Sequence, residues 1–147
     1  MIYSFWIFDR HCNCIYNRDF AQHKPASKDT VNRNNDKDEA KLLFGAIFSM
    51  SRLSSKLSDG NVLQSFRTGK YKAHLKETAT GLRFILISDS NVGDLSGLLN
   101  QLYSDLYLNT IVKNGLSPVD FKEGMVIKNM SFINGADELI TQNGDFI

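Results

Sequence analysis

The segment at residues 2–8 constrains the fold more than any other feature of this sequence. It reads Ile-Tyr-Ser-Phe-Trp-Ile-Phe and is dense in aromatic and β-branched side chains, which favour extended backbone. Because side chains alternate along a strand, apolar groups fall on both faces, with Tyr3, Phe5 and Ile7 on one and Ile2, Trp6 and Phe8 on the other. A strand of this kind is typical of the centre of a sheet that is covered on both sides.

Turn residues and changes of hydrophobic period divide the rest of the chain into further elements. A turn at residues 10–13 leads to a returning strand at residues 14–18, so a β-hairpin opens the domain. Tight turns at Gly69-Lys70 and Thr80-Gly81 separate three more strand-like segments, at residues 63–68, 71–78 and 82–89. Helices are predicted at about residues 38–58 and 92–113, and a short third one near Phe132, Ile133, Leu139 and Ile140.

The order β-β-α-β-β-β-α predicts an α+β domain with a five-stranded antiparallel sheet and helices packed on it. Residues 21–37 contain almost nothing apolar, so we expect a mobile loop there.

The overall charge offers no strong field that would attract nucleic acid or anionic lipid, since 17 basic residues oppose 16 acidic ones. The apolar run at residues 2–8 ends at Asp9, and it is too short for a membrane-spanning helix. The two cysteines, Cys12 and Cys14, are separated by one residue, a spacing unsuited to a stabilising disulfide. We therefore expect a cytosolic protein with reduced thiols that binds no nucleic acid.

The sequence contains no recognised catalytic or phosphate-binding motif. His11, Cys12 and Cys14 could supply three metal ligands, but a structural zinc site needs a fourth, and we interpret both cysteines as small buried hydrophobic residues. Gly69-Lys70 lacks the upstream glycine of a phosphate loop and is interpreted as a hairpin turn. The sequence therefore predicts no catalytic residues, no metal site and no cofactor.

The helix expected at residues 38–58 carries more apolar side chains than packing on one sheet requires. At about 100° per residue they cover an arc of roughly 200°, about twice what one sheet needs. Either the tail or the polar loop covers the surplus, or another protein does, since large apolar surfaces of monomers rarely stay exposed. We favour a partner protein, bound at Leu42, Ala46, Met50, Leu53 and Leu57.

A second stripe on the same helix is basic and includes one aromatic residue: Lys41, Phe48, Arg52 and Lys56. It is either an ordinary solvated helix face or a further protein contact.

Several segments of the chain carry a resemblance to a known family. They are residues 2–16, 39–49, 68–74 and 78–82, together with Leu102-Tyr-Ser-Asp-Leu-Tyr-Leu108 and Leu116-Ser-Pro118. In order and content they resemble the smaller longin-like core subunit, of the sedlin/synbindin class and fungal type, of the TRAPP vesicle-tethering complex. The opening fifteen residues are the most specific part.

The resemblance implies a longin-like domain at residues 1–118 and a C-terminal extension of uncertain structure at residues 119–147. It implies a non-catalytic subunit of a guanine-nucleotide exchange complex, which activates a Rab GTPase in vesicle transport between endoplasmic reticulum and Golgi apparatus. Its partners would be the larger synbindin-like relative, the core subunit with an acylated pocket, and the GTPase, which we expect at the basic stripe. The chain would be cytoplasmic, peripheral at the cis-Golgi and endoplasmic reticulum, and would meet membranes only through the complex.

Two alternatives share the expected fold: the regulatory longin domain of a membrane-fusion protein and the small chain of a clathrin adaptor. A fusion protein needs a heptad segment and a membrane anchor after the domain, and an adaptor chain follows a different motif set. We find neither pattern in this sequence.

Overall fold

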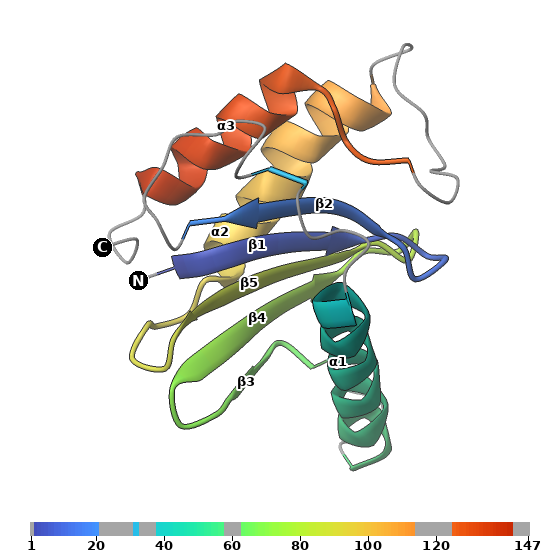
Figure 1. Cartoon of the computed structure of the whole chain (residues 1–147), viewed down its shortest axis with the longest axis vertical. Helices are drawn as coiled ribbons and strands as arrows, with labels where there is room; N and C mark the ends of the chain where they lie inside the picture. The colour runs from blue at the N-terminus through green and yellow to red at the C-terminus, as the bar shows by residue number, and fades with distance from the viewer. Residues whose placement is uncertain (1, 21–30, 33–37, 58–62, 114–124, 143–147) are drawn as a thin grey trace.

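A five-stranded antiparallel sheet separates two helical layers in this protein (Figure 1). The computed structural model describes residues 2–20, 31–32, 38–57, 63–113 and 125–142. The strands, in the spatial order β2-β1-β5-β4-β3, are β1 (Ile2–Phe8), β2 (Cys14–Asp19), β3 (Ser65–Arg67), β4 (Tyr71–Glu77) and β5 (Arg83–Asp89). The predicted longin-like α+β architecture is confirmed.

The helices are divided between the two faces of the sheet. One face is covered by α2 (Ser96–Gln101), η1 (Leu102–Val112) and α3 (Met130–Thr141), and the other carries α1 (Asp38–Leu57). Helices α2 and η1 follow each other directly, so the long helix expected at residues 92–113 is present but begins at Ser96.

The second part of this long helix, η1, has the wider turn of a π-helix. The side-chain amide of Asn109 donates to the carbonyl oxygen of Asp105, and the hydroxyl of Thr110 donates to that of Leu106. Each acceptor is the carbonyl oxygen four residues earlier, the group that would accept from the backbone N–H of Asn109 or Thr110 in an α-helix. These side chains therefore supply hydrogen bonds that the widened backbone does not make.

Strand β1 lies between β2 and β5, the central position predicted from its apolar faces. Phe5 and Ile7 pack in the core beneath α2 and α3, whereas Trp6 and Phe8 pack toward α1. Strict alternation predicts Ile2 beside Trp6, and this is wrong: Ile2 packs in the same core as Phe5. The register between β1 and β5 shifts after Ile2, and a bulge of this kind reverses the face on which preceding side chains lie.

Helix α3 belongs to the main hydrophobic core of the sheet. Its Phe132 meets Tyr16 and Tyr107 edge to face, with ring centroids 5.2 and 5.9 Å apart. The side chain of Asn129 begins the helix by accepting from the backbone N–H of Ser131 and of Phe132. The short helix predicted in this segment is therefore present, while the expected domain boundary at residue 118 lies outside the described residues.

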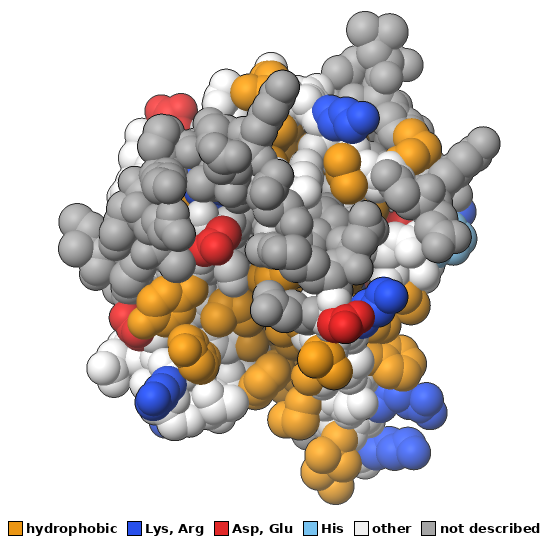
Figure 2. Space-filling model, viewed as in Figure 1, with side chains coloured by type: hydrophobic (Ala, Val, Ile, Leu, Met, Phe, Trp, Pro, Cys, Tyr) orange, Lys and Arg blue, Asp and Glu red, His pale blue; other side chains and the backbone are white. Residues whose placement is uncertain are grey.

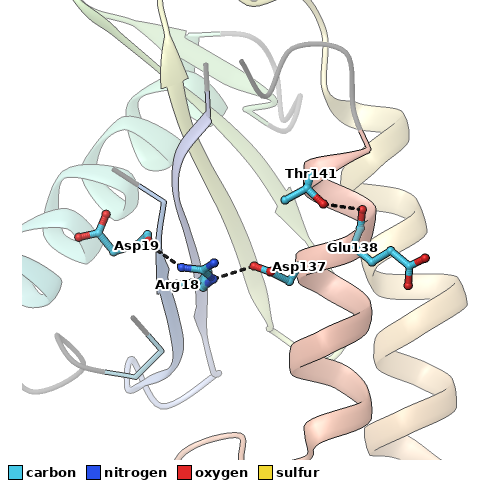
Figure 3. A network of polar contacts seen from close by, with 5 residues as sticks. All are labelled: Arg18, Asp19, Asp137, Glu138 and Thr141. Carbon is cyan, nitrogen blue, oxygen red and sulfur yellow. Dashed lines mark hydrogen bonds and ion pairs between the residues drawn. The ribbon is translucent and has the colours of Figure 1, made fainter. Parts of the chain in front are cut away.

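A buried ion pair joins α3 to β2 (Figure 3). Arg18 donates from Nε to Oδ1 of Asp137 at 2.7 Å and from Nη1 to the carbonyl oxygen of Asp19 at 2.6 Å. Its guanidinium also lies 4.4 Å from the ring centroid of Phe20. Because a buried guanidinium needs partners for its donors, this network joins α3 to the sheet in addition to the apolar packing of Phe132.

The predicted mobile loop at residues 21–37 lies largely outside the described residues. Of its members, Val31 forms an isolated antiparallel bridge with Arg18. Asn32 has a left-handed φ of 56°, which asparagine tolerates, and its side-chain amide donates to the carbonyl oxygen of Ile127 at 2.8 Å. No helix in the described part of the chain is long and apolar enough to cross a membrane.

Candidate interaction surface

Helix α1 packs on the sheet with its first half only. Ala40 and Ile47 are buried, and Leu43 and Phe44 are half-buried, in a cluster that includes Trp6 of the sheet. The spacing 40, 43, 44, 47 is the helical repeat that places side chains on one face. Beyond this contact the second half of α1 extends past the edge of the sheet (Figure 1).

The five residues assigned by sequence to a partner interface all lie exposed on α1. We call them the apolar stripe; exposed fractions include 72% for Leu42, 38% for Met50, 52% for Leu53 and 76% for Leu57, and Ala46 is also exposed. Their three- and four-residue spacing forms one line, turned roughly 110° about the helix axis from the sheet-facing side. Figure 2 shows apolar side chains gathered over α1 and the adjoining sheet. A surface of this kind is typical of a protein–protein contact.

The basic stripe occupies the other exposed side of α1. Lys41, Phe48, Arg52 and Lys56 are all exposed, and the Arg52 guanidinium lies 5.6 Å from the ring centroid of Phe48. The sequence of α1 contains no acidic residue after Glu39, so Arg52 and Lys56 have no acidic neighbour three or four residues away on their own helix. This side of α1 is therefore suited to an acidic partner surface.

Arg83, the first residue of β5, joins the basic stripe from the sheet. Its guanidinium lies 5.4 Å from the ring centroid of Phe44 and 6.0 Å from that of Phe48, and these two rings stack at 6.0 Å. Its Nη2 is 3.5 Å from Oε1 of Glu77 on β4. Sequence reasoning missed Arg83 because no periodic spacing links it to α1. The only available signal was a cation at the edge of an otherwise apolar strand.

The described residues contain no group of three or more His, Cys, Asp or Glu side chains that could hold a metal ion. Cys14 is buried as expected, but Cys12 is exposed, so the interpretation of both cysteines as buried is wrong for Cys12. A φ of 69° places Cys12 in the hairpin turn rather than on the strand. His74 is buried on β4, with Nε2 2.9 Å from Oγ of Ser88.

The pKa shifts in the described structure have structural causes. Burial raises the pKa of Tyr107 to about 12 and that of Tyr16 further still. The pKa of Asp94 is lowered because its carboxylate accepts from the backbone N–H and then from the hydroxyl of Ser96 at the start of α2. Each of these shifts keeps the group in the charge state that it already has at neutral pH, so none prepares a general acid or base.

The fold is that of a longin-like α+β domain, and helix α1 leaves an apolar face and a basic face exposed. The chain belongs to the Sybindin-like family, whose pattern matches residues 2–143 and so includes α3, which lies beyond the resemblance traced to Pro118.

Three relatives are named as subunits of a trafficking protein particle complex. The chain is 44% identical over 125 residues to the trafficking protein particle complex subunit BET5 of Saccharomyces cerevisiae, covering 83% of this chain and 79% of that protein. It is 31% identical over 151 residues to trafficking protein particle complex subunit 1 of Dictyostelium discoideum, covering 99% of each. The human subunit 1 is 29% identical over 144 residues, covering 95% of this chain and 91% of that protein.

Proposed function

We propose that this chain is a non-catalytic core subunit of a TRAPP complex, which acts in vesicle transport between endoplasmic reticulum and Golgi apparatus. The observation that carries the proposal is the apolar stripe of α1, exposed on a domain of the Sybindin-like family. The complex itself is inferred from the names of two relatives, which are subunits of the trafficking protein particle complex. The chain is then cytoplasmic and reaches the cis-Golgi and endoplasmic reticulum through its partners.

The apolar stripe binds a neighbouring subunit, for which the larger synbindin-like relative is the first candidate and the subunit with the acylated pocket the second. Fully burying a leucine side chain contributes about 1.5–3 kcal/mol relative to leaving it exposed. Leu42, Leu53 and Leu57 are each more than half exposed, so covering them favours association strongly. The end of α1 that extends past the sheet makes the stripe accessible to a partner.

The basic stripe contacts the Rab GTPase, and the complex accelerates nucleotide release by binding energy alone. A complex that binds the GTPase more tightly with its switch segments displaced shifts the population toward the state that releases nucleotide. This chain supplies part of that binding surface and no reacting group.

The subunit contact is tested by co-expressing the chain with its candidate partners and separating the products by size-exclusion chromatography. The double variant Leu53→Asp/Leu57→Asp is expected to fold but to elute without the partners. The control is Met130→Asp, which places the same charge on a 58% exposed residue of α3 and is expected to assemble normally. Normal assembly of the double variant would contradict the proposed interface.

The GTPase contact is tested separately in the assembled complex. Reversing Arg52 and Lys56 to Glu is expected to slow nucleotide release without changing assembly. Lys70→Glu is the control, because Lys70 is exposed in the turn before β4, at the opposite end of that strand from Glu77. An unchanged release rate in the double variant with intact assembly would remove the GTPase contact from the proposal.

A further inference from the structure

We infer that Arg83, together with Phe48 and Arg52, forms a binding site for a carboxylate side chain of the GTPase. The inference rests on the proposed GTPase contact and extends it by assigning the central role to a residue that lies on the sheet. Arg83 comes from β5, whereas Phe48 and Arg52 come from α1, so the site exists only where helix and sheet meet.

A single aromatic ring positions both guanidinium groups. The guanidinium carbon of Arg52 lies 5.6 Å and that of Arg83 6.0 Å from the ring centroid of Phe48. Stacking on a ring restricts an otherwise flexible side chain, and the planar donor fork of arginine matches a carboxylate. The ring centroid of Phe44 also lies 5.4 Å from the guanidinium carbon of Arg83. The two donor groups are therefore arranged before any partner arrives.

The positive charge of this cluster is only partly balanced by the described side chains around it. Glu77 lies 3.5 Å from Nη2 of Arg83, longer than the roughly 2.7–2.9 Å typical of a strong charge-assisted hydrogen bond. The Nε of Arg83 is buried and makes no hydrogen bond to any described residue. Lys76, although next to Glu77, lies over the Tyr103 ring on the opposite face of the sheet. The half-exposed carboxylate of Glu77 therefore balances the charge of Arg83 only in part, and the cluster as a whole still attracts a further carboxylate.

Position on the helix favours the GTPase over a neighbouring subunit as the source of this carboxylate. Phe48 and Arg52 lie roughly 140° around the axis of α1 from the apolar stripe. A subunit that covers the stripe therefore leaves the arginine cluster open on the other side. A small hollow lined by Ile47, Ser51 and Leu75 adjoins Arg83.

The experiment measures how tightly the assembled complex binds the nucleotide-free GTPase at several salt concentrations. Arg83→Met keeps an apolar stem against Phe44 and Phe48 but removes the charge. It is expected to weaken binding about 10-fold, as for the loss of a hydrogen bond to a charged group, and to reduce the salt dependence. Arg83→Lys is expected to lie between this variant and the native protein, because lysine keeps the charge without the fork. Lys70→Met is the control.

A second variant tests the site in the opposite direction. Glu77→Gln removes the carboxylate that competes with the GTPase for Arg83. Because the Glu77 side chain is 43% exposed, this substitution is expected to disturb folding little. Binding of the GTPase is expected to become about 2- to 3-fold tighter, a modest change of the size typical for exposed charge pairs. Weaker binding by Glu77→Gln would overturn the inference, even where Arg83→Met fails to fold.

The remaining outcomes separate this inference from the proposed function. Affinity within twofold of native for Arg83→Met, together with a loss for the Arg52/Lys56 reversal, overturns the role of Arg83 and keeps the GTPase contact. No effect of either change overturns both. If the Arg83→Met complex loses a subunit, the carboxylate belongs to that subunit, and the inference that it belongs to the GTPase is overturned.

Discussion

Arg18 on β2 and Asp137 on α3 are 119 residues apart in the chain, yet their side chains meet at 2.7 Å. The Arg18 side chain is 2% exposed and that of Asp137 20% exposed, so the pair closes the edge of the core where the helix crosses the hairpin strand (Figure 3). The pair explains how a segment beyond residue 118 becomes part of the same folded unit as the opening hairpin.

Replacing Asp137 by Ala is expected to destabilise the protein by about 3 kcal/mol, because it removes a carboxylate that pairs with a buried guanidinium. Urea denaturation followed by circular dichroism measures the loss. Glu138→Ala, at the exposed neighbouring position, is the control and is expected to change stability by less than about 0.5 kcal/mol. Equal stability of the two variants would show that the ion pair does not hold α3.

Two apolar residues on α1 are expected to respond very differently to the same truncation. Ile47 is 1% exposed against the sheet and Leu57 is 76% exposed beyond it. Ile47→Ala is expected to cost about 2–4 kcal/mol, the usual range for a buried aliphatic residue, whereas Leu57→Ala costs less than about 0.5 kcal/mol. Thermal melting of both variants measures the difference. A large loss with Leu57→Ala would mean that this side chain packs within the chain.

The turn between β4 and β5 requires a glycine at position 81. Gly81 has a φ of 88°, and an added Cβ would lie 2.8 Å from Cβ of Arg10. Gly81→Ala is therefore expected to destabilise the fold by about 1–3 kcal/mol. Gly69→Ala is the matched control in the β3–β4 turn, where an added Cβ meets no atom within 4 Å. Similar denaturation midpoints for the two variants would contradict the strain at Gly81.

The hydrogen bonds that Asp94 accepts from Ser96 predict a pH-dependent contribution to stability. Hydrogen bonds from Ser96 hold the folded pKa of Asp94 below its ordinary value of 3.8, so the carboxylate stabilises the fold when it is charged. This contribution is complete above the unfolded pKa and disappears as the pH falls through the lower folded pKa. Asp94→Ala is expected to melt slightly lower than the native protein at pH 7.

Melting both proteins at a series of pH values tests this prediction. The difference between the two melting temperatures is expected to persist down to about pH 5 and to close below pH 4, since an unfolded aspartate titrates near 3.9. A difference that is constant down to pH 2 would show that the charge of Asp94 does not contribute.

Elements with a clear hydrophobic period were predictable from sequence. The two apolar faces at residues 2–8 predicted the central strand, and the segment around Phe132 predicted α3, because local alternation and helical spacing report burial directly. The apolar stripe was also predictable, since its spacing places it on a different face of α1 from the residues that meet the sheet. Its role as an interface remains a prediction.

The periodicity of a sequence does not show which distant segments pair with each other in the fold. The side on which Ile2 packs depends on a register shift against β5, and the π-helical turns of η1 depend on side-chain hydrogen bonds and on packing against α3. The exposure of Cys12 depends on a single positive φ in the hairpin turn.

The sequence by itself determined the element order, the absence of a catalytic motif and the surplus of apolar residues on α1, because each is a property of composition or local spacing. Only the tertiary structure decided that the surplus lies exposed and that Arg83 stands beside Phe48 and Arg52. Those arrangements arise when α1 crosses the sheet. The packing of helix on sheet sets the distances between side chains that lie far apart in the chain, and no local pattern encodes them.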